Sequence, residues 1–352
     1  MGVYNITGEQ VCPEDLSRLE YLRSDRTLIW HEEFNDERIN EDKWGHLIGG
    51  YKADVQRYYM YEDVSKNTYI NNGILHITNL RNYPTSQIDF SGAFIDTHGK
   101  FEWKYGLLES RIKFPNAPAY HGTLWTLSSN YNPVYNQEVV GMTPTHERFG
   151  GNYGEMDIAE CDQRNVSCAF HSVATDSFGG YNMGSGTNWH IYGIEWTSTG
   201  ANIYLDRNLV KHVDWNVAEM SGYQNPFQKS HYVILNMNPW LFDESAQTED
   251  FLETEIDWIR VYAPLGVSGT EDTETSITLS ATNINLSVGD FYELIPTFVP
   301  TTVVNQTLKW ESYNNDIVTV CGGDVKAVGT GTTYIRALSK NGCAAYCKVT
   351  VS

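Results

Sequence analysis

The sequence predicts an all-β protein with two domains, and three observations support this prediction. Aromatic residues, which are enriched in strands, are abundant: 23 Tyr, 13 Phe and 10 Trp among 352 residues. Apolar and polar residues alternate over short stretches, whereas a helical pattern is confined to residues 13–23. The composition changes after Tyr262, where a polar stretch begins. A chain of this length is long for one β-domain and suits two.

The elements follow this division along the chain. Residues 1–25 form an N-terminal extension, and residues 26–263 hold the strands of a large sandwich-like domain. Residues 264–275 are polar and without apolar periodicity, which indicates a linker. Residues 276–352 resume with about seven short alternating segments, which predict a small β-sandwich.

The most informative segment is residues 154–160, in which Glu155, Asp157 and Glu160 interrupt an apolar run. Side chains alternate between the two faces of a strand, so Glu155 and Asp157 share a face and Glu160 takes the other. A one-residue β-bulge between Asp157 and Glu160 would bring all three acids to one face. The two glutamates would then approach to about 5 Å, the separation that a retaining glycosidase needs.

An edge strand whose acids face water is the alternative interpretation. The surroundings argue against it, because this strand is otherwise apolar and aromatic residues lie densely on both sides. Carboxylates in an aromatic-lined cleft are typical of sugar-binding sites, since sugar faces stack on rings. The flanking aromatic residues are Trp125, Tyr131, Tyr135, Tyr153, Phe170, Phe178, Tyr181 and Trp189.

The acidic segment resembles the motif of glycoside hydrolase family 16, whose members carry E-x-D-x-E or the bulged E-x-D-x-x-E. Four further segments resemble this family's strands in the family's order: residues 28–35 with Lys43 and Trp44, 105–115, 189–196 and 255–262. The resemblance covers roughly residues 26–263 and implies a β-jelly roll with a concave active-site cleft. It implies that Glu155 is the nucleophile, that Glu160 is the acid and base, and that Asp157 assists Glu155.

The resemblance and the sequence context also suggest substrate-binding and metal-binding residues. His171 lies on the strand after the acidic one, on the inward face by parity, although a packed histidine is the alternative. The substrate-binding candidates are His171, Trp125, Trp189, Trp240, Arg57, Tyr135 and His121. No cofactor is expected for catalysis. A structural calcium, as in many family members, would involve Glu33 and Asp257, with a surface salt bridge as the alternative.

Several substrate-contact positions depart from the glucan-cleaving members of the family. Residues 120–122, Tyr-His-Gly, stand where those members usually have a tryptophan-proline step. Residues 53–57, 130–151 and 237–240 also differ from the usual pattern. We therefore expect an endo-acting retaining β-glycosidase for a galactose-containing substrate, such as an O-glycan, polylactosamine or galactan. The alternatives are a β-1,3- or mixed-linkage glucanase, a transglycosylase, and a non-catalytic glycan-binding adhesin, which the intact set of acids disfavours.

Residues 276–352 resemble the bacterial immunoglobulin-like domain of group 2. This domain could bind carbohydrate, attach the protein to a cell surface or virion, or act as a spacer. Attachment or a spacer role is expected, because a carbohydrate-binding surface needs several exposed aromatic residues and the single tryptophan, Trp310, is expected in the core. The net charge of −20 argues against a nucleic-acid partner. No apolar run approaches the ~20 residues that span a bilayer, and no signal peptide is visible at Met1. We expect an extracellular or cell-surface protein, or alternatively a phage virion-associated one.

Overall fold

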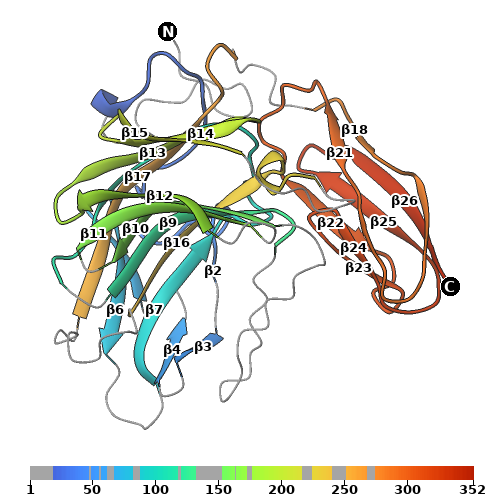
Figure 1. The fold of residues 1–352 in the computed structure, drawn as a ribbon, viewed down its shortest axis with the longest axis horizontal. Coiled ribbons are helices and arrows are strands. Elements are labelled where there is room, and N and C mark those ends of the chain that lie inside the picture. The colour runs from blue at the N-terminus through green and yellow to red at the C-terminus, as the bar shows by residue number, and fades with distance from the viewer. Residues whose placement is uncertain are drawn as a thin grey trace.

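The computed structural model confirms an all-β protein (Figure 1). It describes residues 19–46, 49–54, 57–61, 67–81, 88–117, 120–131, 153–162, 164–172, 177–215, 224–239, 251–267 and 274–352. The helical pattern near the N-terminus gives only a 3₁₀ turn, Leu19–Tyr21, within the described part. No helix in the described part of the chain is long and apolar enough to cross a membrane.

One curved sheet of the large domain carries the acidic strand at its centre. Its strands are antiparallel neighbours in the order β2, β7, β16, β9, β10, β11, β12. The bounds are β2 Gly45–His46, β7 Ile88–Asp96, β16 His231–Pro239, β9 Tyr120–Ser128, β10 Gly154–Asp162, β11 Asn165–Ser172 and β12 Ser177–Ser185.

A second sheet packs against the first and holds the N- and C-terminal strands of the domain. Its order is β15, β14, β13, β8, β17, β6, β5, and β1 pairs with the second half of β17. The short strands β3 and β4 pair with each other, and β4 runs parallel to β7. The bounds are β1 Leu28–Glu32, β3 Gly49–Asp54, β4 Arg57–Tyr61, β5 Thr68–Asn71, β6 Ile74–Arg81, β8 Gly106–Lys113, β13 His190–Trp196, β14 Gly200–Leu205, β15 Asn208–Asp214 and β17 Phe251–Tyr262.

The main hydrophobic core lies between these two sheets. It includes Met156 and Cys161 from β10, Ile112 from β8 and Ile259 from β17. The apolar residues of the acidic segment therefore face the second sheet, as strand alternation requires. The strong burial on one face of β10 leaves the other face for the acids.

The small domain has the predicted sandwich character, but it contains nine strands instead of seven. They are β18 Ser276–Leu279, β19 Asn283–Leu286, β20 Phe291–Glu293, β21 Pro296–Val299, β22 Leu308–Ser312, β23 Val318–Cys321, β24 Asp324–Ala327, β25 Gly331–Ser339 and β26 Ala344–Val351. The difference arises in part because the alternating pattern predicts one strand over residues 292–298, whereas residues 291–299 form the two strands β20 and β21, which join different sheets. Residues 268–273 of the predicted linker lie outside the described part.

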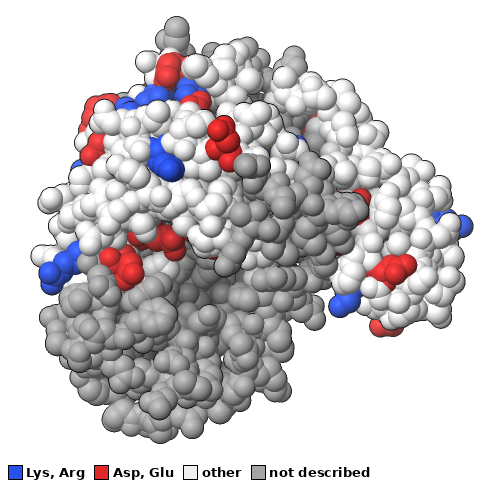
Figure 2. Space-filling model, viewed as in Figure 1, with Lys and Arg blue, Asp and Glu red and all other residues white. Residues whose placement is uncertain are grey.

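Trp310 packs against the core of the small domain, as predicted. The sequence did not reveal that three tyrosines of this domain are exposed: Tyr313, Tyr334 and Tyr346. On the face shown in Figure 2, the Lys and Arg side chains of the described residues lie as separate groups and form no continuous basic surface.

Candidate active site

The three acids share one face of β10 because the strand contains the predicted bulge. The register shifts between Asp157 and Glu160 against β11, and between Asp157 and Ala159 against β9. On β9, the regularly alternating residues Leu127, Trp125 and Thr123 are the cross-strand partners of Glu155, Asp157 and Glu160. Directly paired residues lie on the same face. All three carboxyl groups therefore project from the face opposite the core.

Two histidines from neighbouring strands contact these acids. His171 on β11 has its Nε2 3.1 Å from Oδ2 of Asp157, and His121 on β9 has its Nε2 3.1 Å from Oε1 of Glu160. Asp157 is buried, whereas the side chains of both histidines and of Glu160 are partly accessible. The structure thus places His171 and His121 in the site with the acids.

Burial and mutual repulsion favour the protonated forms of Glu155 and Asp157. Burial raises the pKa of Glu155 well above its ordinary value, the negative charge of Asp157 raises it further, and His171 lowers it. Burial likewise raises the pKa of Asp157, and the charge of Glu160 adds to this. Two adjacent buried carboxyl groups cannot both ionise easily, so they titrate as a unit.

The floor of the site next to the acids is built from β9 and β16. Trp125 donates its indole N–H to Oδ1 of Asn236 at 2.7 Å, and the Thr123 hydroxyl donates to the same oxygen at 2.6 Å. The ring of Phe94 meets that of Trp125 edge to face. Trp125 is half-buried and is held in one orientation by these contacts. The sequence analysis missed Asn236 as a site residue, since only the pairing of β16 with β9 shows that it lies opposite Thr123.

Of the other substrate-binding candidates, the structure describes the side chain of Trp189, which lies at the second sheet and not at the acids. Trp189 precedes β13 in the second sheet, where the Arg111 guanidinium lies 4.4 Å from its ring centre. Trp240 and Tyr135 lie outside the described residues, and Arg57 begins β4 with its side chain outside the described part.

The residues expected to hold calcium are bound to arginines. Both carboxylate oxygens of Glu33 accept hydrogen bonds from Arg260 at 2.8 Å. Oδ2 of Asp257 accepts one from Arg111 at 2.6 Å. These pairs supply cations where calcium would have to bind, so the described residues do not fit a calcium site at these positions. The salt-bridge alternative describes them better, although the pair of Glu33 and Arg260 is buried and the pair of Asp257 and Arg111 is partly buried.

Among the described residues, the group of three potential metal-ligating side chains is Glu155, Asp157 and His171. Their ligand atoms lie within 4.8 Å of one another. These residues are the acidic centre itself, and their contacts are explained by the acid cluster and its histidine.

The large domain is similar to known glycan-cleaving enzymes. A beta-glucanase of Rhodothermus marinus is 24% identical over 274 residues, which cover 68% of this chain and 87% of that enzyme. A glucan endo-1,3-beta-glucosidase A1 of Niallia circulans is 24% identical, over 67% of this chain and 37% of that enzyme. A keratan-sulfate endo-1,4-beta-galactosidase of Sphingobacterium multivorum is 22% identical, over 68% of this chain and 56% of that enzyme. The chain thus spans most of the first relative but only 37% and 56% of the other two.

Solved structures show the same fold. The catalytic domain of an endo-1,3-beta-glucanase (laminarinase) from Thermotoga petrophila RKU-1 is 26% identical, with a TM-score of 0.55. The match covers 68% of this chain and 98% of that domain. A non-specific endo-beta-1,3(4)-glucanase from family 16 is 22% identical, with a TM-score of 0.53, over 68% of this chain and 92% of that one.

A family model matches the small domain: residues 274–349 match the bacterial Ig-like domain (group 2). A minor capsid protein of Enterobacteria phage T3 is 37% identical over 92 residues, which cover 26% of this chain and 21% of that protein. The large domain, with its bulged acidic strand, is thus an endo-β-glycoside hydrolase domain similar to the laminarinases of glycoside hydrolase family 16, and the chain carries a C-terminal bacterial Ig-like domain (group 2).

Proposed function

We propose that Glu155, Asp157 and Glu160 carry out endo-acting, retaining hydrolysis of a β-linked glycan. The observation that supports this most directly is the bulge in β10, which gives the three acids a common face beside a fixed tryptophan. A strand that only exposed its acids to water would not need a bulge to collect them, and it would not bury Asp157.

In the proposed reaction, Glu155 attacks the anomeric carbon while Glu160 gives its proton to the leaving glycosidic oxygen. The bond from the anomeric carbon to that oxygen breaks and an ester bond to Glu155 forms. Glu160, now a carboxylate, then takes a proton from water, whose oxygen displaces Glu155 from the sugar. The configuration at the anomeric carbon is retained because two displacements occur.

Asp157 keeps Glu155 ready to attack. The pair holds one proton between them, and a proton on Asp157 leaves Glu155 as the carboxylate. His171 contacts the other side of Asp157 and fixes its orientation. His121 contacts Glu160 and orients its carboxyl group towards the cleft.

A galactose-containing glycan is the proposed substrate class. His121 stands at the position where the glucan-cleaving members usually have a tryptophan-proline step, and its ring forms a hydrogen bond with Glu160. A polar ring that can donate and accept hydrogen bonds at this place favours contacts with sugar hydroxyl groups over stacking. The similarity to a keratan-sulfate endo-1,4-beta-galactosidase agrees with this proposal.

A β-1,3- or mixed-linkage glucan is the second candidate. It is favoured by the beta-glucanase and laminarinase relatives, which cover most of the large domain. The half-buried Trp125, held by Asn236, provides a ring that either sugar class can stack on.

The test is the release of reducing ends from β-galactans, mucin O-glycans and β-glucans, with the products identified by mass spectrometry. Wild type is compared with Glu155→Gln and with Asp214→Asn, which alters a carboxylate that is 81% exposed on β15. We expect cleavage of one class of glycan by wild type and Asp214→Asn, and none by Glu155→Gln. Cleavage by Glu155→Gln at the wild-type rate would refute the assigned nucleophile, and inversion of the first-formed anomer in an NMR assay would refute retention.

The proposed location is outside the cell, at a cell surface or on a phage virion. The domain of residues 274–349 supports an attachment role, and the similarity to a minor capsid protein of phage T3 agrees with the virion alternative. Binding of the full chain to whole cells, to purified virions and to polysaccharide alone would distinguish these locations.

A further inference from the structure

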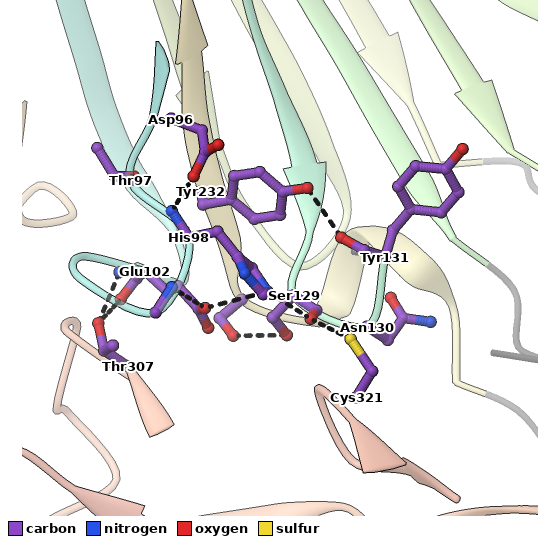
Figure 3. A network of polar contacts seen from close by, with 12 residues as sticks. Asp96, Thr97, His98, Glu102, Ser129, Asn130, Tyr131, Tyr232, Thr307 and Cys321 are labelled. Carbon is purple, nitrogen blue, oxygen red and sulfur yellow. Dashed lines mark hydrogen bonds and ion pairs between the residues drawn. The ribbon is translucent and has the colours of Figure 1, made fainter. Parts of the chain in front are cut away.

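The Ig-like domain is packed into the catalytic domain through backbone hydrogen bonds and a buried side chain. Lys104 donates its N–H to the carbonyl of Val304, and Gln306 donates to the carbonyl of Glu102, at 3.0 and 2.8 Å. Val304 is 4% exposed and belongs to the hydrophobic core of the catalytic domain. Figure 3 shows Glu102 beside Thr307, whose hydroxyl accepts the Glu102 N–H at 2.6 Å. A domain joined only by a flexible linker would not place an apolar residue such as Val304 in the core of the neighbouring domain.

A buried ion cluster joins the two domains at a second point. Nζ of Lys229, from the catalytic domain, lies 2.5 Å from Glu293 and 3.3 Å from Asp324 of the Ig-like domain. All three side chains are 5% exposed or less. Because a buried charge is costly without its partner, this cluster resists separation of the domains.

A chain of hydrogen bonds leads from this cluster to the catalytic strand. Asn130, just after β9, donates its amide N–H to Oδ2 of Asp324 at 2.9 Å. Its Oδ1 accepts the hydroxyl of Ser128 at 2.7 Å, and the Ser128 oxygen accepts the N–H of Gly154 at 3.0 Å. Gly154 is the first residue of β10 and directly precedes Glu155.

The backbone of the Ig-like domain touches the same segment. A Cβ added to Gly322 would lie 2.3 Å from the carbonyl carbon of Ser129 and from the N of Asn130. Figure 3 shows Cys321 beside Ser129 and Asn130, and its Sγ lies 3.8 Å from the Ser129 carbonyl oxygen. The turn between β23 and β24 therefore sits directly against the end of β9, with no space between the two.

We propose that Ser128 and Asn130 are positioning residues for the nucleophile and that the Ig-like domain holds them through Asp324. The domain thereby forms part of the catalytic apparatus in addition to any attachment role. This inference rests on the proposed role of Glu155. Both hydrogen-bonding groups of Asn130 are used, so its side chain cannot change orientation without breaking a link.

The first test reverses the link between the domains. Asn130→Asp places a carboxylate against Asp324 and removes the donor, and we expect kcat to fall about tenfold or more with KM changed less than about twofold. Adding Asp324→Asn supplies the donor from the other side, while the carboxylate at position 130 can still accept from Ser128. We expect the double variant to recover kcat to within about threefold of wild type.

The second test disturbs the backbone contact and has a matched control. Gly322→Ala clashes with Ser129 and Asn130 at a φ of +52°, whereas Gly289 has a φ of +93° and nothing within 4 Å of its added Cβ. Both substitutions strain a turn of the Ig-like domain, but only the first presses on the catalytic domain. We expect a lower kcat in Gly322→Ala and an unchanged kcat in Gly289→Ala.

A measurement that does not depend on activity completes the design. Hydrogen exchange of the peptide from Gly154 to Asp162 should be faster in Asn130→Asp and Gly322→Ala than in wild type, and unchanged in Gly289→Ala. If Glu155→Gln is inactive but Asn130→Asp and Gly322→Ala keep the wild-type kcat and exchange, the positioning inference is wrong and the catalytic assignment stands. If Glu155→Gln is fully active, the catalytic assignment fails, and the exchange data alone report whether the Ig-like domain fixes β10.

Discussion

A substitution in the buried pair of Glu33 and Arg260 tests whether ion pairs or calcium hold the N- and C-terminal strands of the catalytic domain together. Glu33 follows β1 and Arg260 lies in β17, so the pair links two strands 227 residues apart in the chain. Its two hydrogen bonds are both 2.8 Å long, and the guanidinium also lies 4.3 Å from the ring centre of Trp258. The change to make is Glu33→Gln, which keeps the shape and removes the charge.

The expected cost follows from the burial of both partners. The side chains of Arg260 and Glu33 are 0% and 2% exposed, so the guanidinium would remain buried without a counter-ion. Breaking such a pair costs about 3–5 kcal/mol. For a domain of this size each kcal/mol lowers Tm by about 2–4 °C, so a fall of about 10 °C is expected.

The assay is thermal unfolding followed by circular dichroism, with and without EDTA. The control is the double variant Glu33→Leu with Arg260→Met, which replaces the pair by apolar groups of similar size and should be much closer to wild type in Tm. EDTA should leave the Tm of wild type unchanged. A Tm of Glu33→Gln within about 2 °C of wild type, or a large loss of wild-type stability in EDTA, would contradict the ion-pair interpretation.

Two further outcomes are expected. His121→Gln should lower kcat about tenfold with a smaller effect on KM, since His121 Nε2 lies 3.1 Å from Glu160. A kcat equal to that of wild type would contradict a role of His121 in catalysis. Burial raises the pKa of Asp324 from 3.8 to about 6, so the folded protein binds a proton there that the unfolded chain lacks between these values. The difference between the free energies of unfolding of wild type and Asp324→Asn should therefore change by about 2 kcal/mol in favour of wild type as the pH falls from 7 to 4.5. Chemical denaturation of both proteins at both pH values measures this change.

The position of the acids could be predicted because it depends on local geometry alone. The parity of a strand and one extra residue determine which side chains share a face, and both can be read between Glu155 and Glu160. The contact of His171 with Asp157 follows from the same parity on the next strand.

What surrounds the acids could not be predicted because it depends on strands that are distant in sequence. Asn236 reaches Trp125 only because β16 lies next to β9. Two acids in the sequence suggested calcium at Glu33 and Asp257, and nothing local indicates that arginines lie opposite them. The docking of the Ig-like domain depends on Gly322 and other groups that resemble ordinary turn and loop residues until the domains are placed together.

The bulge itself provides a last prediction, which distinguishes strand parity from a general need for acidic residues. Deleting Ala159 leaves one residue between Asp157 and Glu160, so a regular strand again puts all three acids on one face. Deleting both Ile158 and Ala159 instead makes Glu160 the direct neighbour of Asp157, so a regular strand turns Glu160 towards the core, where an unpaired carboxylate costs several kcal/mol.

The single deletion should therefore fold cooperatively and keep measurable hydrolysis, whereas the double deletion should lose activity and stability together. Both variants shorten β10 between Asp157 and Glu160 and keep all three acids in the sequence, so the single deletion serves as the control for the double one. Activity is measured as reducing-end release and stability as Tm, on the same preparations. If the two variants lose activity to the same extent while both remain folded, strand alternation does not determine which face of β10 carries the acids. The geometric basis of the proposed mechanism would then be wrong.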